Sequence, residues 1–450
     1  MAKLAQFRDP DLSLFQSAVD EVVASKTAGT QSQDIGGPAT ITRPDPGQSM
    51  VGMATMEAKA VDAANKSGAP APGVPPAPVG TATEGLGDQV RYCASLARNY
   101  GVAKILGHTA DANRYYDLLT EKMGTCDPCW TETAIKYAEF LASKGQIPYR
   151  TYTNLNDFVI DGKLPANARV ALVGDWGTGQ PEAKTVLAQI ARKNPDVVIH
   201  MGDVYYAGTD FEMENYFYNL LGVSLDLSKV PVYTLCGNHD MFAGGAPYYR
   251  LLDKLGQPAS YFCLRNDAWQ FLAIDTGYHD NKPEGTVPTY LEKTEVAWLA
   301  DKIQNRGNRR TILLSHNQLF TAFEDICGKG VNDSLNAQLS PLLPSVDMWL
   351  WGHEHNLVVY ERYMGVLARC IGHGAFPMGL SDVAAQPRFP EVPATPLRLG
   401  YNGEFYNHGY VIVDLAGSSA TVSYFQDTDE DDAQFTETLA APATASLSAI

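Results

Sequence analysis

The sequence lacks the long apolar runs that cross or enter a membrane. No stretch of the 450 residues approaches the roughly 20 consecutive apolar residues that a spanning helix needs. The first residues, MAKLAQFRDPDLSLF, do not contain the apolar core of a secretory signal. We therefore expect a cytoplasmic protein without membrane insertion, with secretion by another route as the alternative.

Cysteine and positive charge are also scarce. The seven cysteines are odd in number and scattered, which argues against a disulfide framework and fits a reducing compartment. Lys and Arg total 34 against 51 Asp and Glu, which gives a net charge of -17. Nucleic acids and anionic lipids are bound by clustered Lys and Arg, so we expect neither as a partner. An anionic substrate would need bound metal as its source of positive charge.

The first 150 residues differ in composition from the rest of the chain. Apolar residues at helical spacing occur before residue 28 and again between residues 85 and 145. Between them, residues 28–85 are rich in Gly, Pro, Ala and Ser and include the stretch GAPAPGVPPAPVG. We predict a helical region over residues 1–150 that contains a linker at about 28–85.

From residue 168 onward, short apolar runs alternate with helical patterns, which predicts a layered α/β sheet. Strands are predicted at 170–173, 197–201, 230–235, 271–276, 311–314 and 348–351, and helices at 182–192, 211–221 and 292–304. Later runs at 357–360, 365–371, 410–415 and 421–425 predict a second sheet. This gives a catalytic domain over 166–426, followed by an acidic and Ala-rich tail, 427–450, which we expect to be disordered.

Polar clusters directly follow several of these predicted strands. They are Gly174-Asp175-Trp176-Gly177, Gly202-Asp203-Val204-Tyr205-Tyr206, Gly237-Asn238-His239-Asp240, Ser315-His316 and Gly352-His353-Glu354-His355. Ligands of open α/β sheets bind beyond the carboxyl ends of the strands. Each cluster alone would be an ordinary turn or strand end, but the ordered set predicts a metal site.

The ligand types predict two metal ions that share one side chain. Ions about 3.5 to 4 Å apart need a bridging ligand, and a carboxylate has the two oxygens required. We assign Asp203 as the bridge, and Asp175 with His355 to the first ion. The ligands assigned to the second ion, which suit Zn, Mn or Fe(II), are Asn238, His316 and His353. We expect the segment from His353 to His355 to be extended, so that both rings reach one face.

These motifs resemble those of the calcineurin-like metallophosphoesterase superfamily and, within it, of the purple acid phosphatases. The resemblance covers roughly residues 168–425. It implies a four-layer α/β/β/α sandwich and a hydrolase of phosphate esters. The wider superfamily places a histidine two residues after the first aspartate, but Gly177 stands there in this chain. Instead Tyr206 follows Asp203 by three residues, as in the GDxxY motif of purple acid phosphatases.

The resemblance further implies that Tyr206 binds the first ion as a phenolate. A hard anionic oxygen favours Fe(III), so the implied pair is Fe(III) at Asp175, Tyr206 and His355 with a divalent second ion. Such a pair keeps the site cationic despite its anionic ligands and attracts phosphate. Tyr205 is adjacent, and one of the two tyrosines could simply pack. The motif spacing favours Tyr206.

The chemistry implied by the resemblance is attack by metal-activated hydroxide, because paired ions lower the pKa of bound water and clamp phosphoryl oxygens. His239, next to Asn238, is our candidate to protonate the leaving alkoxide or to stabilise phosphoryl charge. Unlike the plant enzymes of this family, the chain has no further histidine after His316 in NQLFTAFED. We expect phosphomonoesters as substrates. The alternatives are a phosphodiesterase for cyclic nucleotides or phospholipid headgroups, and a partner-binding scaffold with an idle site.

The remaining histidines and a cysteine pair are interpreted from their local context. His373 follows a predicted strand in Gly372-His373-Gly374 and is a candidate substrate-binding residue. Cys126 and Cys129 have CxxC spacing but no preceding strand of a redox motif, so we interpret them as ordinary thiols. The side chains that we expect to be packed are His108, His200, His279, His408, Trp349 and Trp351.

Overall fold

The computed structural model describes residues 145–205, 207–280, 288–323, 326–378, 397, 399–402 and 405–441. They belong to a compact unit, Ser143–Ile450. Apart from residues 145–150, the predicted N-terminal helical region and its linker lie outside the described residues. No helix within the described ranges is long and apolar enough to cross a bilayer.

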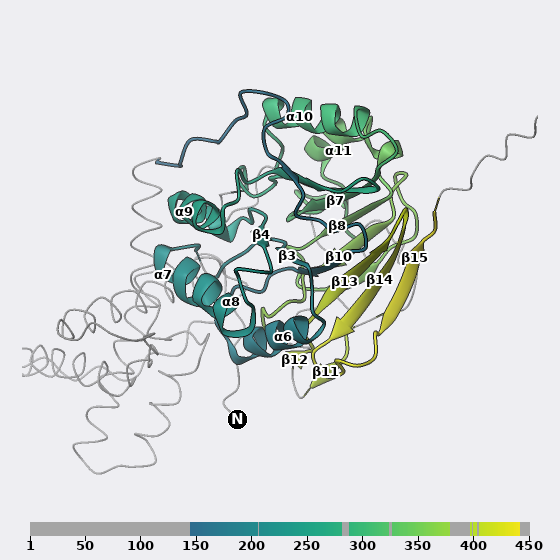
Figure 1. Ribbon diagram of the computed structural model, residues 1–450. Coiled ribbons are helices and arrows are strands. Elements are labelled where there is room, and N and C mark those ends of the chain that lie inside the picture. Colours follow the sequence, from purple (N-terminus) through teal and green to yellow (C-terminus); the bar gives the residue numbers. More distant parts are fainter. Residues whose placement is uncertain are drawn as a thin grey trace, which may run out of the picture. The chain divides into compact units, whose positions relative to one another are not determined.

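Two β-sheets form the centre of this unit (Figure 1). The six-stranded sheet has the order β15-β14-β13-β2-β3-β4, and the seven-stranded sheet the order β1-β5-β6-β7-β8-β10-β9. The first consists of β2 (Arg169–Val173), β3 (Val197–His200), β4 (Val232–Thr234), β13 (Gly409–Ala416), β14 (Ser419–Gln426) and β15 (Phe435–Leu439). The second consists of β1 (Val159–Asp161), β5 (Phe262–Arg265), β6 (Trp269–Ala273), β7 (Arg310–Ser315), β8 (Met348–Trp351), β9 (Leu357–Val359) and β10 (Ala368–Ile371). A short pair, β11 (Tyr401–Asn402) and β12 (Phe405–Tyr406), stands apart from both sheets.

Helices connect the strands and lie outside the sheets. They are α6 (Pro181–Arg192), α7 (Asp210–Glu212), η1 (Met213–Tyr218), α8 (Asn219–Ser224), η2 (His239–Met241), α9 (Ala246–Leu255), α10 (Lys293–Gln304), α11 (Asp333–Leu339) and η3 (Leu343–Ser345). Helix α6 begins at Pro181, whose fixed φ suits the first turn, and buries its apolar stripe of Val186, Leu187 and Ile190.

Three groups of buried side chains show how the layers stack. Leu172 of β2 packs with Phe271 of β6 between the two sheets. Its neighbour Ala171 points to the opposite face, because successive strand residues alternate, and packs with the residues of α6, α8 and α9. Leu313 of β7 packs on the other side with residues of α10 and α11. The order helix, sheet, sheet, helix confirms the predicted α/β/β/α sandwich.

The sequence predicted that the late strands form one additional sheet, and this prediction is wrong. β10 pairs in parallel with β8, and β9 pairs with β10, so both extend the seven-stranded sheet. β13 pairs antiparallel with β2, with Val411 opposite Leu172, and therefore completes the other sheet. The period of two in a sequence reports a strand and its faces but not its neighbours, which explains the error.

The segment 427–450 also differs from the expected disordered tail, because it contains β15. Burial alternates along Phe435–Leu439, as in a strand with one packed face. Glu437 lies on that face and forms a two-pronged ion pair with Arg369 of β10, with 2.7 Å between Nε and Oε1 and 2.5 Å between Nη2 and Oε2. The Tyr424 hydroxyl donates to Glu437 Oε1 at 2.6 Å. This ion pair joins the two sheets.

Replacing Glu437 by alanine is expected to lower the free energy of unfolding by about 3 to 5 kcal/mol, because it leaves a buried charge without its partner. Arg369 is only 3% exposed. Chemical denaturation measures the loss. Thr438→Ala, on the exposed face of the same strand, is the control and is expected to change stability by no more than about 0.5 kcal/mol. Equal small losses in both variants would show that the ion pair does not hold β15.

Candidate metal centre

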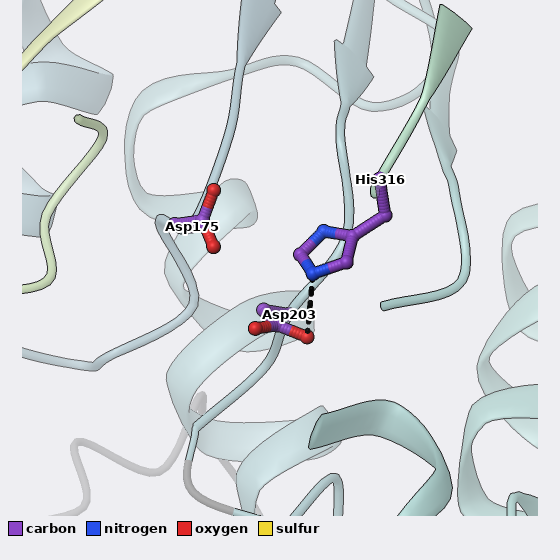
Figure 2. Close-up of side chains that lie close together, drawn as sticks. All are labelled: Asp175, Asp203 and His316. Atoms are coloured by element: carbon purple, nitrogen blue, oxygen red, sulfur yellow. Dashed lines mark ion pairs between the residues drawn. The ribbon is translucent and has the colours of Figure 1, made fainter. Parts of the chain in front are cut away.

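The polar clusters meet beyond the carboxyl ends of β2, β3, β7 and β8. Asp175, Asp203 and His316 offer ligand atoms that all lie within 4.8 Å of one another, and all three side chains are buried. Figure 2 shows the His316 ring directed at the Asp203 carboxylate with Asp175 beside them; the distance from His316 Nε2 to Asp203 Oδ1 is 3.4 Å. The backbone N–H of His353 donates to Asp175 Oδ2 at 2.9 Å, which links the fifth cluster to the first.

Asn238, His316 and His353 form one donor group on this edge. Asn238 Oδ1 lies 3.0 Å from His316 Nε2 and 3.1 Å from His353 Nδ1, and the two ring nitrogens are 3.3 Å apart. The carbonyl oxygen of Met201 lies 3.0 Å from His316 Nδ1 and accepts the proton there, so a neutral ring, which metal binding requires, carries its lone pair on Nε2. That lone pair faces the amide oxygen of Asn238. Two acceptors 3.0 Å apart can serve as neighbouring ligands of one cation.

Asp175, His355 and Tyr205 form a second donor group. The Tyr205 hydroxyl donates to Asp175 Oδ1 at 2.8 Å and lies 2.8 Å from His355 Nε2. His355 Nε2 is 3.5 Å from Asp175 Oδ1, and its ring stacks on Phe376. Tyr206, the tyrosine that the motif spacing favoured, lies outside the described residues. The tyrosine that the structure brings to this group is its neighbour Tyr205.

One close backbone contact explains both why position 177 has no histidine and where Tyr205 lies. A backbone bridge joins Gly177 to Val204, and the Tyr205 N–H donates to the Gly177 carbonyl at 2.9 Å. A Cβ at position 177 would come within 2.9 Å of the Val204 Cα, so a histidine has no space there. The same bridge fixes the Tyr205 side chain against Asp175.

Three of the predicted ligands adopt left-handed backbone conformations that non-glycine residues rarely adopt. The φ angles are 54° at Asp175, 72° at Asp203 and 65° at His353. Such conformations cost of order 1–3 kcal/mol each and are found at functional sites. The segment from His353 to His355 is therefore a bent loop and not the extended segment that we expected, because β8 ends at Trp351. The bend sends His353 to one donor group and His355 to the other.

Asp240 belongs to the site, although no role was predicted for it. Its buried carboxylate accepts hydrogen bonds from the backbone N–H groups of Gly237 at 2.7 Å, Val204 at 2.9 Å and Asp203 at 3.1 Å. Burial and the adjacent Asp203 carboxylate raise the pKa of Asp240. The side chain therefore fastens the loop of Asp203 to the loop of Asn238. The sequence shows Asp240 next to His239 in the third cluster, but it does not show the hydrogen-bond donors on another loop.

The electrostatics of the cluster favour bound positive charge. Burial alone would lower the pKa of His316, but the carboxylates of Asp203 and Asp175 raise it to about 10. Burial opposes the charged form of Asp203, yet His316 and His239 outweigh it and lower the pKa of that carboxyl group. The ionised Asp203 carboxylate is thus stabilised by the positive charge beside it. A carboxylate, imidazole and amide donor set fits a divalent or trivalent metal ion.

Comparison with known proteins shows what this chain is similar to. Residues 168–357 match the calcineurin-like phosphoesterase family. The chain contains a calcineurin-like phosphoesterase domain. Human tartrate-resistant acid phosphatase type 5 is 26% identical over 301 residues, which cover 59% of this chain and 89% of that protein. The phosphoesterase domain and this relative identify the chain as a hydrolase.

Two solved structures resemble the backbone of this chain. One is a dimetal phosphatase from Danio rerio, with a TM-score of 0.42 and 12% identity over 62% of this chain and 100% of that chain. The other is GAP50, the anchor in the inner membrane complex of Plasmodium, with a TM-score of 0.42 and 15% identity over 61% of this chain and 88% of that chain.

His239 lies at the rim of the candidate metal centre. Its backbone N–H donates to Asp203 Oδ1 at 3.0 Å, and its ring Nε2 is 3.9 Å from Asp203 Oδ2. The ring lies 4.7 Å from the ring of Tyr205 and 4.7 Å from that of Phe242, measured between centroids. The side chain keeps 13% of its surface exposed, whereas His316 has none. His239 is thus close to the donor groups and still accessible to a substrate.

The structure places His373 outside the donor groups. The side chain is 2% exposed, and a Cβ at Gly409 would come within 2.7 Å of its Nε2, so the ring packs against that backbone. Burial lowers its pKa to about 4. The predicted packed histidines form hydrogen bonds or ion pairs away from the site: His200 with Thr234, His279 with Glu292, and His408 with the Phe376 carbonyl. Trp349 and Trp351 are buried as predicted. His108, Cys126 and Cys129 lie outside the described residues.

Proposed function

We propose that the chain hydrolyses phosphate esters at a two-metal centre. The observation that carries the proposal is the mutual proximity of Asp175, Asp203 and His316, each of which offers one ligand atom within 4.8 Å of the other two. Asp175 and His316 belong to the two separate donor groups, and Asp203 offers a carboxylate oxygen close to both. A carboxylate between two such groups suits a shared ligand. The proposed ligands are Asp175, Asp203, Tyr205, Asn238, His316, His353 and His355.

The donor chemistry suggests which ions the two groups would hold. A tyrosine oxygen with Asp175 and His355 suits Fe(III), and Asn238 with two imidazoles suits Zn, Mn or Fe(II). When bound, such ions lower the pKa of water and offset charge on the phosphoryl group. The acidic chain, with its net charge of -17, would otherwise repel the substrate.

The chain's own residues supply orientation and a proton. Asp240 fixes the loops that present Asp203 and Asn238, so the ligands need little reorganisation. His239, with 13% of its side chain exposed, can hold a proton on Nε2 and pass it to the leaving alkoxide. We propose phosphomonoesters as substrates because the human relative is an acid phosphatase.

Metal analysis combined with a panel of esters tests this function. We expect about two metal ions per chain and hydrolysis of monoesters such as nitrophenyl phosphate in preference to the bis-nitrophenyl diester. Exhaustive chelation should abolish turnover, and readdition of metal should restore it. A chelated preparation that keeps its full rate would refute the metal-dependent mechanism. Preference for the diester would leave the centre in place and reassign its substrate.

The two adjacent tyrosines provide a matched pair for testing the first ligand group. Iron-loaded protein is expected to show a visible phenolate-to-iron charge-transfer band. Tyr205→Phe should abolish that band, because the Tyr205 hydroxyl contacts Asp175 and His355. Tyr206→Phe should leave it in place. Absorption spectra of both variants at equal iron content decide between them, and the reverse result would restore the assignment made from motif spacing.

A further inference from the structure

Four arginines line a cavity that no part of the proposed phosphoesterase reaction uses. The cavity has a volume of about 450 Å³ and is formed by segments from four places in the chain. Its basic side chains are Arg306, Arg309, Arg310 and Arg362. Pro344, Val346, Leu367 and Leu439 add apolar walls. A concave site with a few convergent polar groups is the usual form of a small-molecule site.

Three of these arginines form no ion pair with a carboxylate of the described residues. Arg306, Arg309 and Arg362 are the only arginines in the described part of the chain without an ion pair to a carboxylate. The chain carries 51 acidic residues against 34 basic ones, so unpaired arginines gathered at one place stand out. Asp347, the one carboxylate among the described residues that line the cavity, is already bound to Arg310 at 2.6 Å and to the Thr311 N–H at 2.9 Å.

Backbone carbonyls hold the unpaired guanidinium groups in place. Arg306 Nη1 donates to the Ile303 carbonyl at 2.9 Å, and Arg362 Nη1 donates to the Gly365 carbonyl at 2.9 Å. Arg309 donates from Nε to the Asn266 carbonyl at 2.6 Å and from Nη1 to the Arg306 carbonyl at 3.2 Å. A guanidinium has five N–H donors, so each group is oriented and still has donors to offer. Oriented donors cost less entropy on binding than free side chains do.

We propose that this arginine cavity binds a small phosphorylated molecule with more than one negative charge. Guanidinium groups match the geometry of phosphate oxygens and form paired charge-assisted hydrogen bonds with them. A volume of about 450 Å³ exceeds what a single phosphate fills, so the ligand carries a further portion that contacts the apolar walls.

The cavity is separate from the metal centre. Strand β7 begins at Arg310 of the cavity and ends at Ser315. The next residue, His316, belongs to the metal centre. Six residues of strand span about 20 Å, because each residue advances the chain by roughly 3.3 Å. One small molecule cannot reach both places. The arginine cavity is therefore a second site, independent of catalysis at the first.

Binding of naphthalene-1,3,6-trisulfonate to the full-length, as-purified protein tests the proposal. Sulfonates share the tetrahedral oxyanion geometry of phosphates, are not substrates, and bind metals weakly. Calorimetry or probe fluorescence should show one saturable site, from which methylenediphosphonate displaces the probe. The double variant Arg309→Gln, Arg362→Gln should bind about tenfold or more weakly and keep wild-type esterase activity. The charge-matched control Arg192→Gln, Arg250→Gln removes two ion-paired surface arginines and should bind like the wild type.

Each outcome supports or contradicts ligand binding at the arginine cavity. Loss of binding in the cavity variant alone, with displacement by the diphosphonate, supports it. Equal weakening in both double variants would show a general charge effect, and unchanged affinity in the cavity variant or no saturable site in the wild type would overturn it. If the double variant fails to melt cooperatively, Arg362→Gln alone decides by the same criterion, because Arg362 is exposed and its hydrogen bond goes to a nearby carbonyl.

Discussion

Replacing Asp203 by asparagine is expected to lower kcat/KM for phosphate monoesters by at least about 1,000-fold. Asp203 offers a carboxylate oxygen within 4.8 Å of a ligand atom of Asp175 and of His316, which belong to the two donor groups. An amide has the same shape but one oxygen and no charge, so it cannot serve two cations. We also expect the metal content to fall below two ions per chain. Steady-state kinetics and metal analysis on the same preparation measure both effects.

The control for Asp203→Asn is the same change at Asp226, which is exposed and paired with Lys229. Asp226→Asn should keep the wild-type rate and metal content. Thermal unfolding should confirm that both variants are folded, because asparagine preserves the side-chain volume. A folded Asp203→Asn protein that retains both ions and its full rate would contradict the bridging role and leave the two donor groups without a shared ligand.

Most of the proposed ligands could be predicted from the sequence because their signal is local. Asp175, His316 and His353 each come within two residues of the end of an apolar run, and such runs become the strands β2, β7 and β8. Parallel pairing of β7 with β8 then brings the ends of those strands to the same edge of the sheet. Residue type and order along the chain were sufficient to identify this edge.

The tyrosine and Asp240 depend on contacts that the sequence does not report. Counting residues from Asp203 favours Tyr206, which lies outside the described residues and stays a prediction, whereas the contact of Tyr205 with Asp175 beside the Gly177–Val204 bridge could not be found by counting. Likewise, the neighbours of Asp240 in sequence do not reveal that its carboxylate accepts N–H groups from the Asp203 loop. Both features arise where two loops meet, and an apolar pattern along one segment says nothing about such meetings.

The acidic tail shows a conflict between composition and periodicity. Residues 427–432 contain five carboxylates, and this charge density suggested disorder for everything that follows. The short run FTETL alternates in burial and forms β15, because β14 offers it an edge to pair with. Pairing with β14 thus outweighed the local composition. Pairing partners also decided which of the two sheets each late strand joined.

His239→Ala is expected to reduce kcat for alkyl phosphates by about 100- to 1,000-fold, as expected for the loss of a general acid. An alkoxide is a poor leaving group and needs a proton. Nitrophenyl phosphate should lose much less rate, because nitrophenolate leaves without one. Since the side chain of His239 lies 3.9 Å from Asp203 and outside both donor groups, the variant should retain its two ions. Parallel kinetics on both esters, with metal analysis, measure this selectivity.

A histidine that is similarly accessible but distant in role provides the comparison for His239. His279 is 17% exposed and pairs with Glu292, so His279→Ala tests whether loss of any half-buried histidine slows turnover. It should affect both esters slightly and equally. If His239→Ala slows both esters by the same large factor, the ring stabilises charge on the phosphoryl group and does not donate a proton to the leaving group. If it slows neither ester, another group supplies the proton, and the rim position of His239 has no catalytic consequence.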